Sequence, residues 1–316
     1  MTERYLVGLI GSGVTPSLTP TMHEREAEHL GLRYLYQPID LDLLELDADY
    51  LGDMIKFARL LGFRGLNITH PCKQAVLAHL DEISPAAAAI GAVNTVVFDS
   101  RRAIGHNTDA YGFEQNLTRR LPSASLDKVI LLGAGGVGSA VANVLLGLGT
   151  NRLVVVDPNP ARVEQLTSAL RARFDEARIG SAPPDRVDRE LADADGVVNA
   201  SPSGMAAHPG LPLPAELLRP ELWVADLVYF PLETELLRKA RHAGCRTLDG
   251  GGMAVFQAVG AFDLFTGLRA DADRMLEHFR ELTESTTAEV GPANAESRID
   301  EQVAKRVHYG DPPAVL

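Results

Sequence analysis

Apolar and polar positions change period repeatedly along the chain, and the most regular stretch lies between residues 128 and 157. Residues 129–132 form an apolar run of strand length, and a turn with four glycines follows at residues 133–138. Apolar residues then recur at helical spacing, and a second apolar run at residues 153–156 ends on Asp157. This order predicts a strand, a glycine-rich turn, a helix and a second strand, which is the unit that binds dinucleotides.

Each part of this unit suits contact with a pyrophosphate and a ribose. Gly133 permits a tight turn, Gly135 lets the backbone approach a phosphate, and Gly138 allows the helix to pack close to the strand. The first helical turn offers free N–H groups and the positive end of the helix dipole. Asp157 can accept hydrogen bonds from both ribose hydroxyls. A glycine loop that merely connects a strand to a helix is the alternative, but the flanking strands and the acid favour dinucleotide binding.

The part of the chain before this unit shows the same change of period. The pattern predicts strands at residues 6–10, 34–39 and 91–98, with residues 103–106 pairing back as a hairpin, and helices at residues 21–31, 50–61, 86–90 and 111–120. A further strand begins at Gly65 and is expected to run into a helix that starts near Pro71, a favoured first helical position.

The part after this unit continues the alternation. A helix is expected at residues 158–174, residues 175–185 are weakly patterned, strands follow near 197–199, 223–226 and 246–248, and helices cover 233–243 and a long stretch after 249. Such alternation predicts a parallel sheet that is covered on both faces. Residues 286–316 are polar, and we expect a flexible C-terminal tail there.

Polar residues gather where predicted strands end, which is the edge at which open α/β sheets bind ligands. Thr69 and Lys73 follow one such strand. Lys73 could be a solvated residue in a first helical turn, but its charge would oppose the helix dipole there, which favours a functional role. Ser17 and Thr19 lie in a loop rich in turn formers, where capping is the simpler interpretation. Gln257 could likewise be a buried, satisfied amide or a ligand contact.

Composition narrows the functional classes. The net charge of −12 disfavours partnership with nucleic acid or an anionic membrane, and no apolar run approaches the ~20 residues of a membrane span. The two cysteines, Cys72 and Cys245, and the nine histidines show no metal-binding spacing, so no metal is expected. The polar N-terminus lacks a signal peptide pattern, and a cytoplasmic location is the simplest expectation.

Seven motifs in order resemble those of the shikimate dehydrogenase family, over roughly residues 5 to 283. They are Asn67-x-Thr69-x-Pro71-x-Lys73, Gly91-Ala92-x-Asn94-Thr95, Asn107-Thr108-Asp109-x-x-Gly112, the glycine turn, Asn199-Ala200-x-Pro202-x-Gly204-Met205, Asp226-x-Val228-Tyr229-x-Pro231-x-x-Thr234 and Gly252-Met253-x-x-x-Gln257. Each motif alone is modest, but together they are specific.

The resemblance implies an α/β protein with two domains and reversible oxidation of a ring hydroxyl. An α/β substrate-binding domain would comprise residues 1–110 plus 250–285, and a Rossmann-like, doubly wound dinucleotide-binding domain would comprise residues 111–249. Lys73 and Asp109 would be the acid/base pair, because a positioned amine can take the proton of the reacting hydroxyl. The substrate-binding residues would be Ser17, Thr19, Thr69, Lys73, Asn94, Asp109, Tyr229 and Gln257, with the first two and Tyr229 at the substrate carboxylate.

Two departures from the family pattern refine this expectation. Strict shikimate enzymes carry a second serine where this chain has Thr19, and a serine/threonine pair is similar to the quinate/shikimate dehydrogenases. Relatives that use NADP usually carry a basic cluster after the second strand, whereas residues 157–162 read Asp-Pro-Asn-Pro-Ala-Arg. We therefore expect NAD rather than NADP. The cofactor-binding residues would be Gly133, Ala134, Gly135, Gly136, Val137, Gly138, Asp157, Arg162, Ser201, Leu227 and Gly250.

Other functions stay open at this point. An NADP-dependent biosynthetic shikimate dehydrogenase or an aminoshikimate dehydrogenase would share these motifs, and a binding protein of Rossmann type that has lost catalysis is an alternative of another class. The presence of both Lys73 and Asp109 argues against the last of these. The expected partners are small-molecule substrates, shikimate and quinate, bound by a monomer or a homodimer.

Overall fold

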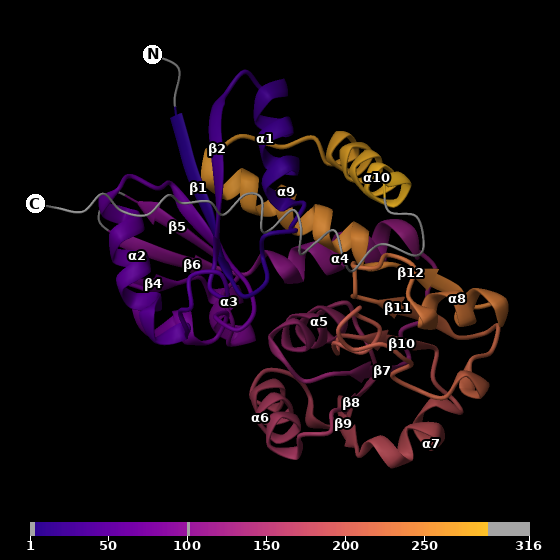
Figure 1. Ribbon diagram of the computed structural model, residues 1–316. Helices are drawn as coiled ribbons and strands as arrows, with labels where there is room; N and C mark the ends of the chain where they lie inside the picture. The colour runs from indigo at the N-terminus through magenta and orange to yellow at the C-terminus, as the bar shows by residue number, and fades with distance from the viewer. Residues whose placement is uncertain (1–3, 100–101, 290–316) are drawn as a thin grey trace, which may run out of the picture.

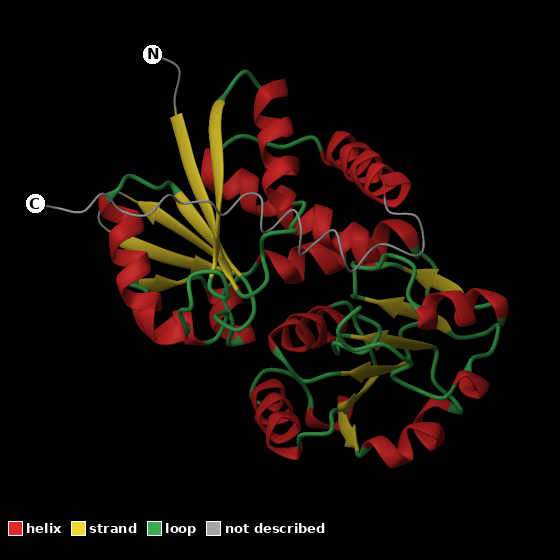
Figure 2. Ribbon diagram, in the orientation of Figure 1, coloured by secondary structure: helices red, strands yellow, loops and turns green. Residues whose placement is uncertain are grey.

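The computed structural model describes residues 4–99 and 102–289 and contains two α/β domains, each built on a six-stranded sheet (Figures 1 and 2). The strand orders are β2-β1-β3-β5-β6-β4 and β12-β11-β10-β7-β8-β9. The predicted fold class, two α/β domains of which one is a Rossmann-like doubly wound unit, is therefore confirmed. Among the described residues, no helix has the length and apolar character needed to cross a membrane.

The first sheet is mixed. It contains β1 (Arg4–Gly11), β2 (Arg33–Asp40), β3 (Gly65–Ile68), β4 (Glu82–Ile83), β5 (Thr95–Asp99) and β6 (Arg102–His106), and β5 runs antiparallel to both β3 and β6. Alternate residues of β1 face opposite sides of the sheet. Leu9 packs with Phe265 of α9 (Gly250–Thr266), whereas Ile10 packs with Ile55 of α2 (Leu51–Leu60). Helices therefore cover both faces of this sheet.

The second sheet is entirely parallel, as predicted. It contains β7 (Lys128–Leu132), β8 (Arg152–Val156), β9 (Ile179–Ala182), β10 (Gly196–Asn199), β11 (Trp223–Asp226) and β12 (Arg246–Leu248). One face packs against α5 (Gly136–Gly147) and α6 (Pro160–Arg171), and the other against α7 (Val187–Leu191) and α8 (Glu235–His242). Burial on both faces explains why its strands are almost continuously apolar.

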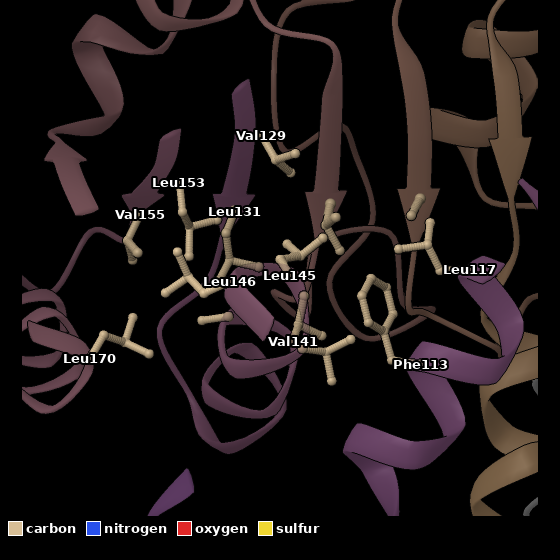
Figure 3. Packing of buried hydrophobic residues seen from close by; sticks show 14 of the residues in the cluster. Phe113, Leu117, Val129, Leu131, Val141, Leu145, Leu146, Leu153, Val155 and Leu170 are labelled. Carbon is tan, nitrogen blue, oxygen red and sulfur yellow. The ribbon is translucent and has the colours of Figure 1, made fainter. Parts of the chain in front are cut away.

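Helix α4 (Thr108–Arg120) joins the two sheets. Its Phe113 and Leu117 lie in the same apolar core as Val141 and Leu145 of α5 (Figure 3). The same helix runs beside α9, where a Cβ on Gly112 would come within 2.7 Å of the Met253 carbonyl. The predicted division at residues 110 and 250 thus falls inside α4 and at the first residue of α9.

The prediction of a helix that starts near Pro71 is wrong. Residues 70–74 form turns, and Ala75–His79 is a short 3₁₀ helix. An α-helix would need the Lys73 carbonyl to accept a hydrogen bond four residues later, but that carbonyl accepts the Val93 amide at 2.9 Å instead. Lys73 is therefore not in a first helical turn, and the argument from an opposed helix dipole does not apply to it.

Smaller differences concern boundaries. Helix α1 (Thr19–His29) begins two residues earlier than expected and α4 begins three earlier, while β9 and α7 occupy segments without a clear expectation. Helix α3 (Pro85–Ile90) matches its prediction within one residue. Helix α10 (Ala272–Glu289) continues through residues 286–289, the first residues of the expected tail. The rest of that tail, residues 290–316, lies outside the described residues.

Candidate active site

Lys73 and Asp109 form an ion pair near the carboxyl edge of the first sheet. Lys73 Nζ lies 2.7 Å from Asp109 Oδ2, and the two side chains are only 16% and 7% exposed. Lys73 comes from the turn after β3, and Asp109 from the first turn of α4, which Asn107 caps by accepting the Ala110 amide. Two segments distant in sequence thus bring an amine and a carboxylate together in a site largely shielded from solvent. Charge-assisted hydrogen bonds are strong in such a site.

Asn94 holds the other oxygen of this carboxylate. Its Nδ2 donates to Asp109 Oδ1 at 2.9 Å and to Thr108 Oγ1 at 3.0 Å. Its Oδ1 accepts the Thr108 amide at 2.7 Å and the Thr95 hydroxyl at 3.0 Å. These contacts fix which way the Asn94 amide points, because the reverse orientation would set donors against donors.

A second layer of buried groups holds this arrangement. Asn67 Nδ2 donates to the Asn94 carbonyl at 3.2 Å and to Thr95 Oγ1 at 3.0 Å, and Asn67 Oδ1 accepts the Tyr36 hydroxyl at 2.6 Å. Tyr36, Asn67 and Thr95 are all buried. A connected and satisfied network of this kind rigidifies the groups it contains.

The loop that carries Ser17 and Thr19 is organised by Asp40 at the end of β2. Asp40 accepts the Gly13 amide and the Thr15 amide, both at 2.9 Å, and the Thr15 hydroxyl at 2.7 Å. Burial by itself would raise the pKa of Asp40, but these hydrogen bonds to the charged form lower the pKa below its ordinary value. Within the loop, Ser17 Oγ accepts the Thr19 amide at 3.3 Å.

Further contacts bring this loop to the Lys73 segment, although no hydrogen bond between described residues joins Ser17 or Thr19 to Lys73. The Ser12 amide donates to the His70 carbonyl at 2.9 Å, and the Thr69 amide donates to the Ile10 carbonyl at 2.9 Å. A Cβ on Gly11 would fall 2.3 Å from the Thr69 methyl group, so the two chain segments touch there.

Tyr229 and Gln257 are the remaining side chains that the sequence predicts at the substrate. Tyr229 is 46% exposed overall, yet desolvation raises the pKa of its phenol, and the charge of Asp109 raises that pKa further. Gln257 of α9 is half-buried against Gly112 of α4, one helical turn after Asp109, and its Nε2 donates to the Ala254 carbonyl.

Three glycines of the turn lie in different surroundings. Gly133 has φ of 105°, which favours glycine, and a Cβ on Gly138 would fall 2.1 Å from the Gly133 carbonyl oxygen. Gly135 precedes α5, and its Cβ position faces open space. Helix α5 begins without a side-chain cap and without an acidic residue in its first turn, so its first N–H groups are open to an anion. Ala134, Gly136 and Val137 complete the turn.

Asp157 at the end of β8 binds this turn directly. Its Oδ2 accepts the Ala134 amide at 2.8 Å, and its Oδ1 accepts the Asn159 amide at 2.8 Å. Arg162 lies in the first turn of α6, is exposed, and makes no side-chain hydrogen bond or ion pair with another described residue.

Ser201, Leu227 and Gly250 follow β10, β11 and β12, at the same carboxyl edge as the glycine turn. Asp226 is fully buried beneath them, and its carboxylate accepts Asn199 Nδ2 at 2.9 Å and the Thr234 hydroxyl at 2.6 Å. Burial raises the pKa of Asp226, although these hydrogen bonds oppose that shift.

Sequence reasoning assigned no role to several residues that hold the site together, although three of them stand in the motifs quoted above. These are Tyr36, Asp40, Thr95, Thr108 and Asp226. Asp40 and Asp226 each end an apolar run, so a search for carboxylates at strand ends would have found them. The threonines and Tyr36 carry no such signal, because their role depends on tertiary pairing. Among the described residues, no group of three or more potential metal ligands occurs.

Comparison with known proteins identifies the family of this chain. Residues 9–96 match the family model for the shikimate dehydrogenase substrate binding domain, and residues 129–207 match that for the saccharopine dehydrogenase NADP binding domain. A Streptomyces avermitilis protein named shikimate dehydrogenase (NADP(+)) is 59% identical over 280 residues, which are 89% of this chain and 96% of that protein.

Solved structures extend the comparison. Quinate dehydrogenase from Corynebacterium glutamicum in complex with NAD superposes with a TM-score of 0.83 at 46% identity, covering 88% of this chain and 99% of that one. Shikimate 5-dehydrogenase from Listeria monocytogenes in complex with shikimate and NAD gives a TM-score of 0.78 at 31% identity, with coverage of 88% and 99%. The chain therefore belongs to the shikimate dehydrogenase family, which consists of oxidoreductases that act on a CH–OH group.

Proposed function

We propose that this protein is an NAD-dependent quinate/shikimate dehydrogenase, which reversibly oxidises a ring hydroxyl of shikimate to give 3-dehydroshikimate and of quinate to give 3-dehydroquinate. The observation that carries the proposal is the Lys73–Asp109 pair beside the glycine turn. A Cβ on Gly136 would lie only 3.9 Å from Lys73 Cβ and Cδ. An acid/base pair and a phosphate-binding turn are thus adjacent, as transfer between a bound alcohol and a dinucleotide requires.

The residues present fit a nicotinamide dinucleotide. The open N–H groups of α5 and the free space at Gly135 suit a pyrophosphate, and Ser201, Leu227 and Gly250 line the same edge of the sheet. When bound, the nicotinamide supplies a hydride acceptor. Lys73 with a neutral amine would take the proton that the substrate hydroxyl loses, and the ammonium so formed would pair with Asp109, which Asn94 holds in position.

Substrate recognition would use both sides of this site. Ser17 and Thr19 would bind the ring carboxylate with help from Tyr229, and Thr69, Asn94, Asp109 and Gln257 would bind ring hydroxyls. The loop held by Asp40 supports the first part of this assignment, because its hydroxyls are presented on a fixed backbone. The methyl group of Thr19 would shape the carboxylate end, where quinate carries an additional hydroxyl.

Asp157 supports NAD as the cofactor. A 2′-phosphate on the adenosine ribose would meet its negative charge, whereas two free ribose hydroxyls could donate to it. The relatives differ in the cofactor that their names give. The Streptomyces avermitilis protein is named for NADP(+), and Corynebacterium glutamicum proteins at 46% identity are named for NAD(+). An NADP-dependent shikimate dehydrogenase is therefore the second candidate.

Initial rates test the proposal. The purified protein is assayed with shikimate and with quinate, each with NAD and with NADP, by following absorbance of the reduced nicotinamide. We expect turnover of both substrates and a higher kcat/KM with NAD. Turnover of shikimate alone with NADP would establish the second candidate instead. No turnover in any combination, from a folded protein, would exclude both.

A further inference from the structure

Side chains of the second domain donate hydrogen bonds to the last carbonyl groups of helix α3. It ends at Gly91, so its last carbonyl groups lack partners within the helix. Ser139 Oγ of α5 donates to the Ile90 carbonyl at 2.6 Å, and Arg173 donates to the Ala89 carbonyl at 3.5 Å. Two backbone acceptors of the first domain thus receive hydrogen bonds from the domain that carries the glycine turn.

Small apolar residues close the same contact. Ala140, the neighbour of Ser139, packs with Ile90 and Ala92 in a buried cluster, and Ala110 packs against it. The short side chain of Ala140 on α5 lets this helix approach Ile90 and Ala92 closely. The Ser139 hydrogen bond is therefore at the rim of a packed contact between the domains.

This contact is connected to the reacting groups. The Val93 amide donates to the Lys73 carbonyl at 2.9 Å, so a backbone hydrogen bond ties the chain after Ile90 to the Lys73 turn. A Cβ on Gly136 would lie 3.7 Å from Ala92 Cβ. Ser139 is three residues after Gly136 on α5, so docking α5 on α3 also sets the phosphate-binding turn against Lys73.

We propose that Ser139 is a positioning residue, whose hydrogen bond to the Ile90 carbonyl holds the two domains at the separation that hydride transfer needs. The proposal rests on the proposed dehydrogenase function. The two domains are also joined through α4 and α9, and the contact between α3 and α5 restrains them at a further point. Ser139 touches neither substrate nor cofactor in this role, and its effect passes through the placement of Lys73 and the glycine turn.

Ser139→Ala tests the role with little risk to folding, because alanine is the best helix former. The matched control is Ser168→Ala on α6, whose hydroxyl donates to Glu164 at 2.8 Å on an exposed surface. Four quantities are measured for each variant and the unmodified enzyme: kcat, the dissociation constant for NAD, the melting temperature, and the primary isotope effect on kcat with substrate deuterated at the reacting carbon.

We expect Ser139→Ala to lower kcat about three- to tenfold, the effect of losing one hydrogen bond. NAD affinity should stay as in the control, and the melting temperature should fall by a few degrees at most, as the loss of one hydrogen bond implies. The isotope effect should rise because hydride transfer becomes slower relative to product release. An unchanged kcat with an unchanged isotope effect would overturn the proposal, as would a loss of kcat accompanied by equally weaker NAD binding. Failure of the dehydrogenase assignment is distinguishable, since the unmodified enzyme would then turn over neither substrate.

Discussion

Asp157 Oδ2 accepts the Ala134 amide at 2.8 Å, so the acid at the end of β8 holds the glycine turn in shape before any ligand arrives. A carboxylate has about four acceptor sites, and those that remain can still receive ribose hydroxyls. The side chain therefore combines support of the turn with a negative charge at the ribose. Asparagine lacks the charge and retains one acceptor oxygen, so it can keep the contact to the Ala134 amide while it loses the contact to the Asn159 amide.

Asp157→Asn is predicted to narrow the preference for NAD. In the unmodified enzyme, kcat/KM with NAD should exceed kcat/KM with NADP by roughly one to three decades. Like charges ~4 Å apart repel by about 1 kcal/mol in water and about 4 kcal/mol at an effective dielectric of 20. Without the charge, kcat/KM with NADP should rise. Asp157→Ala should instead weaken both cofactors, because the Ala134 amide loses its acceptor. An unmodified enzyme that prefers NADP would contradict the prediction, and Arg162 would then be the residue to replace.

Lys73→Ala is predicted to lower kcat by about two to four decades, the usual contribution of general acid/base catalysis. Substrate should still bind, because the other polar groups remain. Measurement of kcat and of the shikimate dissociation constant checks both statements. Lys56→Ala, on the exposed side of α2, is the control for loss of a lysine charge. Turnover near the normal rate in Lys73→Ala would remove the lysine from the proton transfer.

Thr19→Ser is predicted to lower the ratio of kcat/KM for quinate to that for shikimate. One methyl group changes discrimination by ~1–3 kcal/mol at most, so the change should not exceed about two decades. The Ser17–Thr19 contact should survive, because it uses the backbone amide of residue 19. A ratio equal to that of the unmodified enzyme would mean that Thr19 does not set specificity.

His23 is predicted to make stability depend on pH. It is fully buried among Tyr34, Tyr36 and Phe262, and desolvation lowers the pKa of its imidazole to about 3. The unfolded chain, with a histidine pKa of about 6.5, binds the proton more readily, so this group's contribution is complete above pH ~6.5 and falls as pH decreases towards 3.

Urea unfolding at pH 7, 6 and 5 measures this contribution. Below pH ~6.5 the loss from His23 should approach about 1.4 kcal/mol per pH unit in the free energy of unfolding. His23→Gln keeps a polar partner for Tyr34 and does not titrate, so its stability should fall less steeply. Parallel slopes for the two proteins would show that another group is responsible.

The sequence predicts the second domain well because its signals are local. The glycine turn, the apolar strands and Asp157 each act through neighbours in the chain, and the parallel sheet follows from the alternation of elements. The expected helix at Pro71 failed for the opposite reason. A hydrogen bond from Val93, distant in sequence, takes the Lys73 carbonyl, and no local pattern contains that information. The same holds for Thr95 and Thr108 around Asn94, since only the fold brings β5 and α4 together.

The first sheet depends on a helix, α9, that is synthesised after every strand of both sheets. Arg64 Nε donates to the Phe265 carbonyl at 3.0 Å, and the ring of Phe265 covers Gly65 so closely that a Cβ there would fall 2.3 Å from it. On the ribosome, β1 and β3 must therefore wait, with one face uncovered, until α9 has emerged, whereas the second sheet is complete once β12 has been made. We infer that the later part of the chain folds first. Protease digestion of nascent chains stalled before and after α9 would reveal this order, with β1 and β3 protected only in the longer chain.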